Sequence, residues 1–183
     1  MAGTTARPAM SGSRRARRCA ARGCSRWRRA TAYPSGVRGT PVEIAESQTP
    51  LIFWKKELRP NSGGVGRTQG GHGQIIEIGS GIDRPWDILA AFDRIEHPPR
   101  GRDGGHDGAA GYVGLASGAR LRGKGMQLVA PGDRLVVLTP GGGGIGAPAE
   151  RKPEQVARDL ADGLVSEGTA KDLYGYTGVK AAE

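Results

Sequence analysis

Two apolar runs and a run of glycines follow one another in Met126-Gln-Leu-Val-Ala-Pro-Gly-Asp-Arg-Leu-Val-Val-Leu-Thr-Pro-Gly-Gly-Gly-Gly-Ile-Gly146. The apolar runs, 126–130 and 134–139, are separated by Pro131-Gly132. Proline presets the first central residue of a turn, and glycine accepts the positive φ that the second central residue needs in a type II turn. The pattern predicts a β-hairpin that leads directly into the glycine run.

The glycine run is open to two interpretations. Residues 141–146 contain G-x-G-x-x-G after an expected strand and before an expected helix, as in a dinucleotide-binding fingerprint. No strand is expected after that helix, so the βαβ unit is missing. The sequence also lacks G-x-x-x-x-G-K-[ST], which excludes a Walker-type ATP loop. Close backbone packing at a strand end and an anion-cradling loop of backbone N–H groups both remain open. The candidate residues of an anion or substrate loop are Arg38, Gly141, Gly142, Gly143 and Gly144.

Short apolar runs earlier in the chain predict further strands. Pro41 and Pro50 exclude a single long helix over the first of them. A glycine-dense loop is expected at 62–73. The segment 86–95 fits a helix or a strand, of which we favour the strand. The expected strand residues are Val42 and Ile44, then 51–54, 74–78 and 86–95.

The C-terminal part has helical signals. Pro153 suits a first helical position, and Ser166 is a good N-cap for a second helix that ends near Gly175. The residues expected to face inward are Val156, Leu160 and Leu164 on the first helix, which Gly163 closes, and Ala170 and Leu173 on the second. The fold class predicted is α+β, with a glycine-rich, mainly β body followed by a C-terminal helical hairpin.

Residues 1–30 differ sharply from the rest of the chain. They hold 9 arginines and no lysine, aspartate or glutamate, so the formal net charge of +9 comes from them and the remaining 153 residues are neutral. A nucleic-acid arm, an organelle transit peptide and a segment foreign to the fold are the three interpretations, and we favour the third. Because it has almost nothing to bury, this leader is expected to be disordered.

The positions of the cysteines and the lengths of the apolar runs indicate the cellular compartment to expect. Cys19 and Cys24 both lie in the leader, so no disulfide framework is expected in the main domain, which is usual for a cytosolic protein. No apolar run approaches the ~18 residues that span a bilayer. We therefore expect a cytoplasmic protein without a membrane partner.

Two groups of titratable residues suggest a functional role, and each group also has a simpler structural interpretation. Asp103, His106 and Asp107 form D-x-x-H-D, which could bind a metal, but solvated loop residues are expected instead. Glu43 and Glu46 could act as an acid/base pair, although ion pairs with Arg38 or Lys55 are favoured. We expect no metal site in this chain.

An ordered series of motifs carries a family resemblance. The series contains Tyr33-Pro-Ser-Gly-Val-Arg-Gly-Thr-Pro-Val-Glu-Ile-Ala-Glu46, Glu57-Leu-Arg-Pro-Asn-Ser-Gly-Gly-Val-Gly-Arg-Thr-Gln-Gly-Gly-His-Gly73, Pro140-Gly-Gly-Gly-Gly-Ile-Gly146, Arg151, Gly163-Leu-Val-Ser166 and Tyr174-Gly175. In this order and spacing it resembles the C-terminal part of the hydantoinase B/oxoprolinase family. The expected organisation is a leader at 1–30 and a C-terminal portion of such a domain at 31–183.

The resemblance implies an activity class. Members of the family are parts of ATP-dependent enzymes: N-methylhydantoinase, 5-oxoprolinase and the biotin-independent acetone and acetophenone carboxylases. An A-type partner holds ATP and Mg and phosphorylates the substrate, and the B-type part completes ring opening or carbon–carbon bond formation. The chain is thus expected to belong to a cyclic-amide hydrolase for 5-oxoproline or a hydantoin, with a ketone carboxylase as the alternative and nucleic-acid binding through the leader as a third possibility.

The chain also departs from the family pattern. It resembles only the C-terminal portion of a B-type subunit, and the metal ligands of carboxylase relatives lie in the absent N-terminal part. No metal role therefore passes to His72, His97 or His106. We expect this chain to bind no cofactor itself, to need an A-type subunit and the remainder of a B-type subunit as partners, and to be inactive alone.

Overall fold

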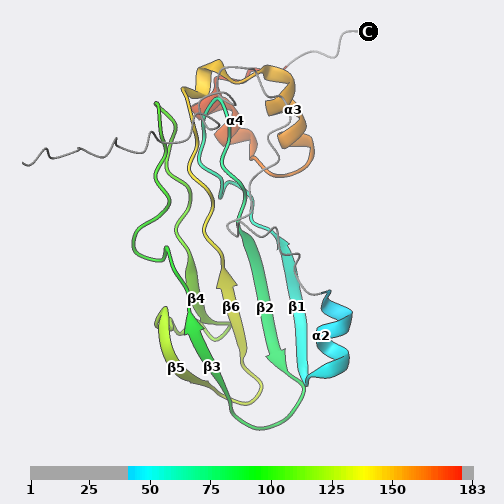
Figure 1. Ribbon diagram of the computed structural model, residues 1–183. Coiled ribbons are helices and arrows are strands. Elements are labelled where there is room, and N and C mark those ends of the chain that lie inside the picture. Colours follow the sequence, from blue (N-terminus) through cyan, green and yellow to red (C-terminus); the bar gives the residue numbers. More distant parts are fainter. Residues whose placement is uncertain (1–40, 179–183) are drawn as a thin grey trace, which may run out of the picture. The chain divides into compact units, whose positions relative to one another are not determined.

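The computed structural model describes residues 41–178, and their helices and strands are labelled in Figure 1. Helix α2 (Val42–Gln48) precedes six strands, and a 3-10 turn and two helices follow the strands. The later elements are β1 (Leu51–Leu58), β2 (Gln74–Ser80), β3 (Trp86–Ala91), β4 (Tyr112–Leu115), β5 (Lys124–Val129), β6 (Arg134–Leu138), η1 (Pro148–Glu150), α3 (Pro153–Ala161) and α4 (Glu167–Tyr174). No helix within 41–178 is long and apolar enough to cross a membrane.

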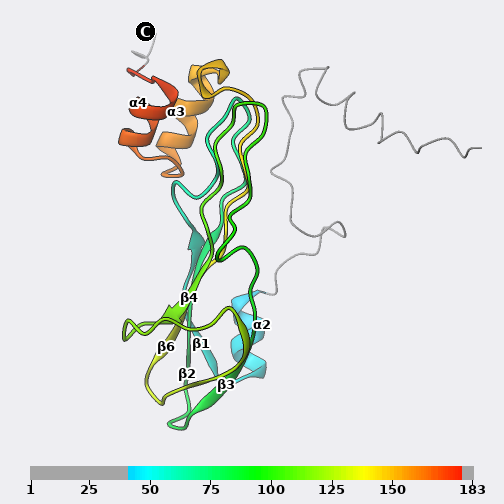
Figure 2. The ribbon, with the colours of Figure 1, turned by 90° about the vertical axis from the view of Figure 1, so that its left-hand side faces the viewer.

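The strands form two antiparallel sheets. A four-stranded sheet has the order β1-β2-β6-β4, and β3 and β5 form a separate two-stranded ribbon. The ribbon lies against one side of the larger sheet (Figures 1 and 2). The shared core consists of Ile88, Ala90, Val113, Val129, Leu135 and Val137. This arrangement confirms the α+β class with a mainly β body and C-terminal helices.

The predicted hairpin pairing is wrong, although both of its strands exist. The turn also forms, with Gly132 at a φ of 75° and the Asp133 N–H donating to the carbonyl oxygen of Ala130 at 3.2 Å. However, β5 pairs with β3, while β6 pairs with β2 and β4. The turn therefore connects two layers instead of two neighbouring strands. Residues 135–138 are apolar throughout, which suits the central position that β6 holds in its sheet, where Leu135 and Val137 are buried.

The first predicted strand is a helix. Val42 and Ile44 lie in α2, whose first turn is closed by the Ala45 N–H donating to the carbonyl oxygen of Pro41 at 3.2 Å. The Thr49 side chain donates back to the carbonyl oxygen of Ala45 at 2.7 Å where the helix ends. Two apolar residues in alternation are too short a pattern to distinguish a strand from one turn of helix. The strand predictions at 51–54 and 74–78 are confirmed by β1 and β2. The prediction at 86–95 is confirmed over 86–91, and residues 92–95 lie beyond the end of β3.

The two C-terminal helices follow their predicted signals. Pro153 begins α3, and the Ser166 hydroxyl accepts from the Thr169 N–H as the N-cap of α4. Gly175 ends α4 in the left-handed conformation, with a φ of 64°. The prediction for Leu173 is wrong, because this residue is 41% exposed. The helices share a small core of Val156, Val165 and Ala170, against which Leu160, Tyr174 and Tyr176 pack.

Candidate functional site

Extended segments without strand structure lie side by side between the sheet and the helix pair (Figures 1 and 2). We call residues 61–73, 97–111 and 139–147 the glycine bundle. Backbone hydrogen bonds join its segments: the Gly64 N–H donates to the Gly142 oxygen at 2.8 Å, and the Arg102 N–H donates to the Gly144 oxygen at 2.9 Å. The glycine bundle is therefore held together by its main chain.

The central segment of the glycine bundle shows why four consecutive glycines are needed. A Cβ on Gly141 would lie 1.6 Å from the Ser62 oxygen, and one on Gly143 would lie 2.1 Å from the Arg100 oxygen. A Cβ on Gly142 would face residues 70–71. A Cβ on Gly144 would face the same stretch as one on Gly141, 2.3 Å from the Val65 oxygen. Successive residues thus face two parts of the segment 61–73 and the segment 97–111. Each direction in which a side chain could project is occupied by backbone.

The N–H groups of this segment are largely engaged. Gly141 donates to the Ala109 oxygen at 3.0 Å, Gly142 to the Gly71 oxygen at 2.8 Å and Gly144 to the His106 oxygen at 2.9 Å. An N–H group that donates to a carbonyl is not free to cradle an anion. This placement favours close backbone packing over an anion loop at Gly141, Gly142, Gly143 and Gly144. The assignment of an anion or substrate loop stays a prediction, and Arg38 lies outside the described residues.

The D-x-x-H-D motif forms a turn of the glycine bundle. Asp107 accepts from the Gly101 N–H at 2.7 Å, and the His106 N–H donates to the Val65 oxygen at 2.7 Å. Asp103 adopts a φ of 52°, which belongs to the turn. Within residues 41–178 no three His, Cys, Asp or Glu side chains gather in a way that could hold a metal ion. The motif therefore serves backbone packing in this part of the chain.

One residue of the acidic pair at the start of the described chain, Glu46, has a structural contact. Glu43 and Glu46 lie on α2 instead of on a strand, and the Glu46 carboxylate accepts from the Phe53 N–H of β1 at 2.7 Å. Lys55, expected as an ion-pair partner for this pair, contacts Glu57 at 3.3 Å. Glu46 thus fixes the helix to the edge of the sheet.

A buried ion pair lies at the helix pair. The Arg151 guanidinium contacts the Asp159 carboxylate, and the two side chains are only 7% and 8% exposed. The same guanidinium lies over the Tyr174 ring, 5.3 Å from its centroid. Such a pair is costly to form and costly to break, because each charge is removed from water. The sequence gives no signal for this pair, because Arg151 precedes α3 while Asp159 lies within it, and helical spacing therefore does not relate the two residues.

Asn61 connects the helix pair to the glycine bundle. Its N–H donates to the Leu164 oxygen at 2.9 Å, and its side-chain oxygen accepts from the Ser166 N–H at 2.9 Å. Asn61 adopts a φ of 54°, a conformation that asparagine tolerates better than most residues. At the far end, Arg67 pairs with Glu150 of η1 at 3.0 Å. The helix pair is thus tied to the glycine bundle through Asn61, and η1 is tied to it through Arg67.

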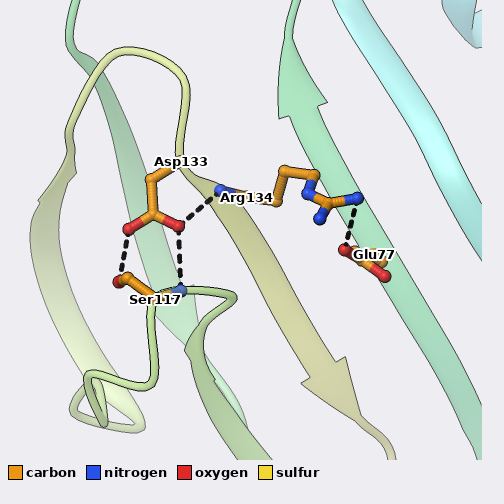
Figure 3. Close-up of polar contacts among 4 residues, drawn as sticks. All are labelled: Glu77, Ser117, Asp133 and Arg134. Atoms are coloured by element: carbon orange, nitrogen blue, oxygen red, sulfur yellow. Dashed lines mark hydrogen bonds and ion pairs between the residues drawn. The ribbon is translucent and has the colours of Figure 1, made fainter.

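A second polar cluster lies at the sheet (Figure 3). The Asp133 carboxylate accepts from the Ser117 hydroxyl at 2.6 Å and from the Arg134 N–H at 2.8 Å. The hydrogen bond from Ser117 lowers the pKa of Asp133 below its ordinary value, and the bonds from the two N–H groups act in the same direction. Asp133 is therefore ionised at neutral pH and acts as an acceptor that joins two loops, not as a proton donor.

The Arg134 side chain points away from this carboxylate. Its guanidinium contacts Glu77 of β2 at 2.9 Å (Figure 3). The same guanidinium lies over the Trp54 ring, 5.0 Å from its centroid. Trp54 reaches this position from a β-bulge between Phe53 and Lys55. The Arg134 guanidinium is thus occupied by Glu77 and Trp54, just as the Asp133 carboxylate is occupied by Ser117 and the Arg134 N–H. Among the described residues, the polar clusters identified at both ends of the molecule act as structural ties.

Comparison with known proteins gives the class of this protein. Residues 18–148 match the hydantoinase B/oxoprolinase family, and the chain belongs to this family. It is 32% identical over 152 residues to a B-type D-/L-hydantoinase chain of Pseudomonas sp. (strain NS671), covering 78% of this chain and 25% of the relative. It is 37% identical to 5-oxoprolinase 1 of Arabidopsis thaliana, over 63% of this chain and 9% of the relative. The chain thus spans a quarter or less of the length of these relatives.

Solved structures support the same fold. The chain resembles the ATP-dependent caprolactamase from Pseudomonas jessenii with a TM-score of 0.63 at 22% identity, over 79% of this chain and 26% of that one. It resembles the nucleotide-free structure of an acetone carboxylase with a TM-score of 0.58 at 22% identity, over 74% of this chain and 23% of that one. The family match begins at residue 18, inside the segment expected to be a leader, and the boundary between 30 and 31 stays a prediction.

Proposed function

We propose that this chain forms part of the B-type subunit of a cytoplasmic, ATP-dependent hydrolase that opens a cyclic amide of the 5-oxoproline or hydantoin kind. The observation that supports the proposal most is the family match over residues 18–148. The named relatives include a B-type hydantoinase chain, a 5-oxoprolinase and a beta chain of caprolactamase, all of them named for cyclic amides. ATP and Mg belong to an A-type partner in this proposal.

The chemistry requires more than the described residues offer. An amide is a poor electrophile because resonance stabilises its carbonyl, and transfer of a phosphoryl group from ATP to the amide oxygen removes that stabilisation. Water then opens the ring, and ADP and phosphate are released. In residues 41–178 the carboxylates of Asp107, Asp133 and Asp159 are all engaged by hydrogen bonds or an ion pair. The catalytic groups are therefore proposed to lie in the remaining B-type polypeptide and the A-type subunit.

The part of this chain in that enzyme is proposed to be a rigid support. The glycine bundle contains little side-chain volume between its segments and is fixed by main-chain hydrogen bonds. Such an arrangement keeps the helix pair at a constant distance from the sheet. A support of this kind positions neighbouring parts of a complex without touching the substrate.

A second candidate function is a subunit of a biotin-independent ketone carboxylase. The fold likeness to an acetone carboxylase favours it, with a TM-score close to that of the caprolactamase. The two functions share the activation of an oxygen by ATP and differ in the nucleophile that follows.

The test reconstitutes the complex from this chain, the rest of a B-type polypeptide and an A-type subunit encoded in the same genome. ADP release is measured with 5-oxoproline, with hydantoin, and with acetone and bicarbonate. We expect ADP release coupled to ring opening from the complete set and none from this chain alone. Turnover by the isolated chain would contradict the proposal, and ADP release with acetone and bicarbonate only would select the carboxylase. A mixture without this chain is the control.

A further inference from the structure

The four-stranded sheet has one face in the core and one face turned away from it. Leu135 and Val137 of β6 pack in the core with the β3–β5 ribbon, and side chains alternate between the two faces along a strand. The residues next to them therefore project away from the core, and the residues paired with those share that side. We call this side the open face and define it by Ile75, Tyr112, Arg120, Arg122, Val136 and Leu138.

Arg120 and Arg122 extend the open face beyond the edge of β4. The segment that carries them runs antiparallel to β4: the Leu121 N–H donates to the Val113 oxygen at 3.1 Å, and Arg120 pairs with Gly114. Leu121 packs against the core beside Val113. The residues on either side of Leu121 therefore lie on the open face, and both arginines are exposed.

The Tyr112 ring lies along the open face instead of standing up from it. A Cβ on Gly114 would collide with the Tyr112 hydroxyl group, so the ring crosses the position of residue 114. The Arg120 guanidinium lies over this ring, 5.9 Å from its centroid. Val136 and Leu138 continue the apolar surface and are only partly buried. A sheet face left to water normally carries polar residues, whereas apolar residues with tyrosine and arginine are typical of protein interfaces.

The positive charge of the open face is not compensated by the described residues. Within residues 41–178, no carboxylate forms an ion pair with Arg120 or Arg122. By contrast, Arg134 on the same side of the sheet is paired with Glu77 at 2.9 Å (Figure 3). The open face thus combines an apolar centre with two unpaired positive charges at its β4 edge.

This combination decides between occupants. A second copy in a two-fold contact would bring the same positive charges to the interface, where like charges repel. Single-stranded nucleic acid needs several rings on which successive bases stack, and the open face has one, Tyr112, which Arg120 already covers. A protein segment that carries carboxylates beside apolar residues matches both features of the open face.

The spacing of the two arginines favours a helix as that segment. Residues two apart on an extended chain are separated by about 6.6 Å, and carboxylates one helical turn apart by about 5–6 Å. We propose that the open face binds an acidic amphipathic helix of a partner protein. Its carboxylates pair with Arg120 and Arg122, and its apolar stripe covers Val136 and Leu138. The inference goes beyond the proposed function, since it does not depend on the reaction that the complex catalyses.

Crosslinking of a synthetic helix tests the location of the binding. The probe is a peptide of about five helical turns, with leucines along one stripe, glutamates along one margin of the stripe and a photo-reactive group among the leucines. It is added to the full chain, and the crosslinked residues are found by mass spectrometry. We expect crosslinks to Tyr112, Val136 or Leu138. Crosslinks confined to residues 1–30, whose arginines attract any acidic peptide, or no crosslinks at all, would overturn the inference.

Charge reversal gives a second readout, because fluorescence anisotropy measures the dissociation constant of the same peptide. Arg122→Glu should weaken binding about tenfold, since an attractive surface pair is replaced by a repulsive one. Arg158→Glu makes the same change at an exposed position of α3 and is the matched control, expected to alter the constant by less than about twofold. Circular dichroism checks that both variants fold. Equal effects of the two substitutions would overturn the inference.

Two further probes separate the other occupants. The peptide with lysines in place of the glutamates should bind more weakly than the acidic peptide, and equal binding would contradict the charge complementarity. A single-stranded oligouridylate that binds more tightly than the acidic peptide, and loses that affinity with Arg122→Glu, would show a nucleic-acid surface instead. A dimer of the free chain in sedimentation that Arg122→Glu dissociates would show a second copy as the occupant. Either of the last two results would overturn the inference.

Discussion

Replacement of Gly141 by alanine is the sharpest test of the glycine bundle. The added Cβ would lie 1.6 Å from the Ser62 oxygen and 2.3 Å from its carbonyl carbon. That oxygen cannot simply move away, because it accepts from the Ala109 N–H at 2.8 Å and so ties a third segment to the same point. Overpacking in a core costs about 1–3 kcal/mol when side chains can adjust. Here the obstacle is backbone, so we expect Gly141→Ala to lower the free energy of unfolding by about 3 kcal/mol or more.

Urea denaturation followed by circular dichroism measures this effect. Gly168→Ala is the matched control, because Gly168 lies in α4, does not need a positive φ, and a Cβ added there would meet no heavy atom within 4 Å. It should raise the free energy of unfolding by about 0.5 kcal/mol, since alanine is the better helix former. A loss below about 1 kcal/mol for Gly141→Ala would refute the close packing of this segment.

Two further predictions concern the polar clusters. Arg151→Met should lower the free energy of unfolding by about 3–5 kcal/mol, because it leaves the buried Asp159 carboxylate without its guanidinium. The double variant Arg151→Met with Asp159→Leu should recover most of the loss. Thermal melting of the unchanged protein and the two variants checks both expectations. Ser117→Ala should raise the pKa of Asp133 towards its ordinary value, as measured by NMR titration of the carboxyl carbon. Since the folded pKa of Asp133 lies below the unfolded one, its contribution to stability is present above about pH 3.9 and is lost as the pH falls through the folded pKa, so the variant should lose less stability on acidification. An unchanged titration of Asp133 would contradict the role given to Ser117.

Local features of the fold could be read from the sequence. Pro153 and Ser166 mark helix starts, and Gly132 and Gly175 adopt the positive φ values expected of turn and cap glycines. Each of these signals depends on a residue and its near neighbours. The same holds for the strands, whose apolar runs indicate burial. The family resemblance also came from residue order and spacing, which the match over 18–148 bears out.

Pairing and environment could not be read in this way. Leu135 and Val137 identify a strand, but only the assembled sheet places β6 between β2 and β4 and β5 beside β3. Four glycines are compatible with a ligand loop or with close packing, and the choice depends on segments far away in the chain that supply the surrounding carbonyls. Likewise, the exposure of Leu89 follows from which face of the ribbon meets the core. Backbone conformation is set by short-range sterics and hydrogen bonds, whereas partners and burial are set by chain segments that meet only when the whole domain has folded.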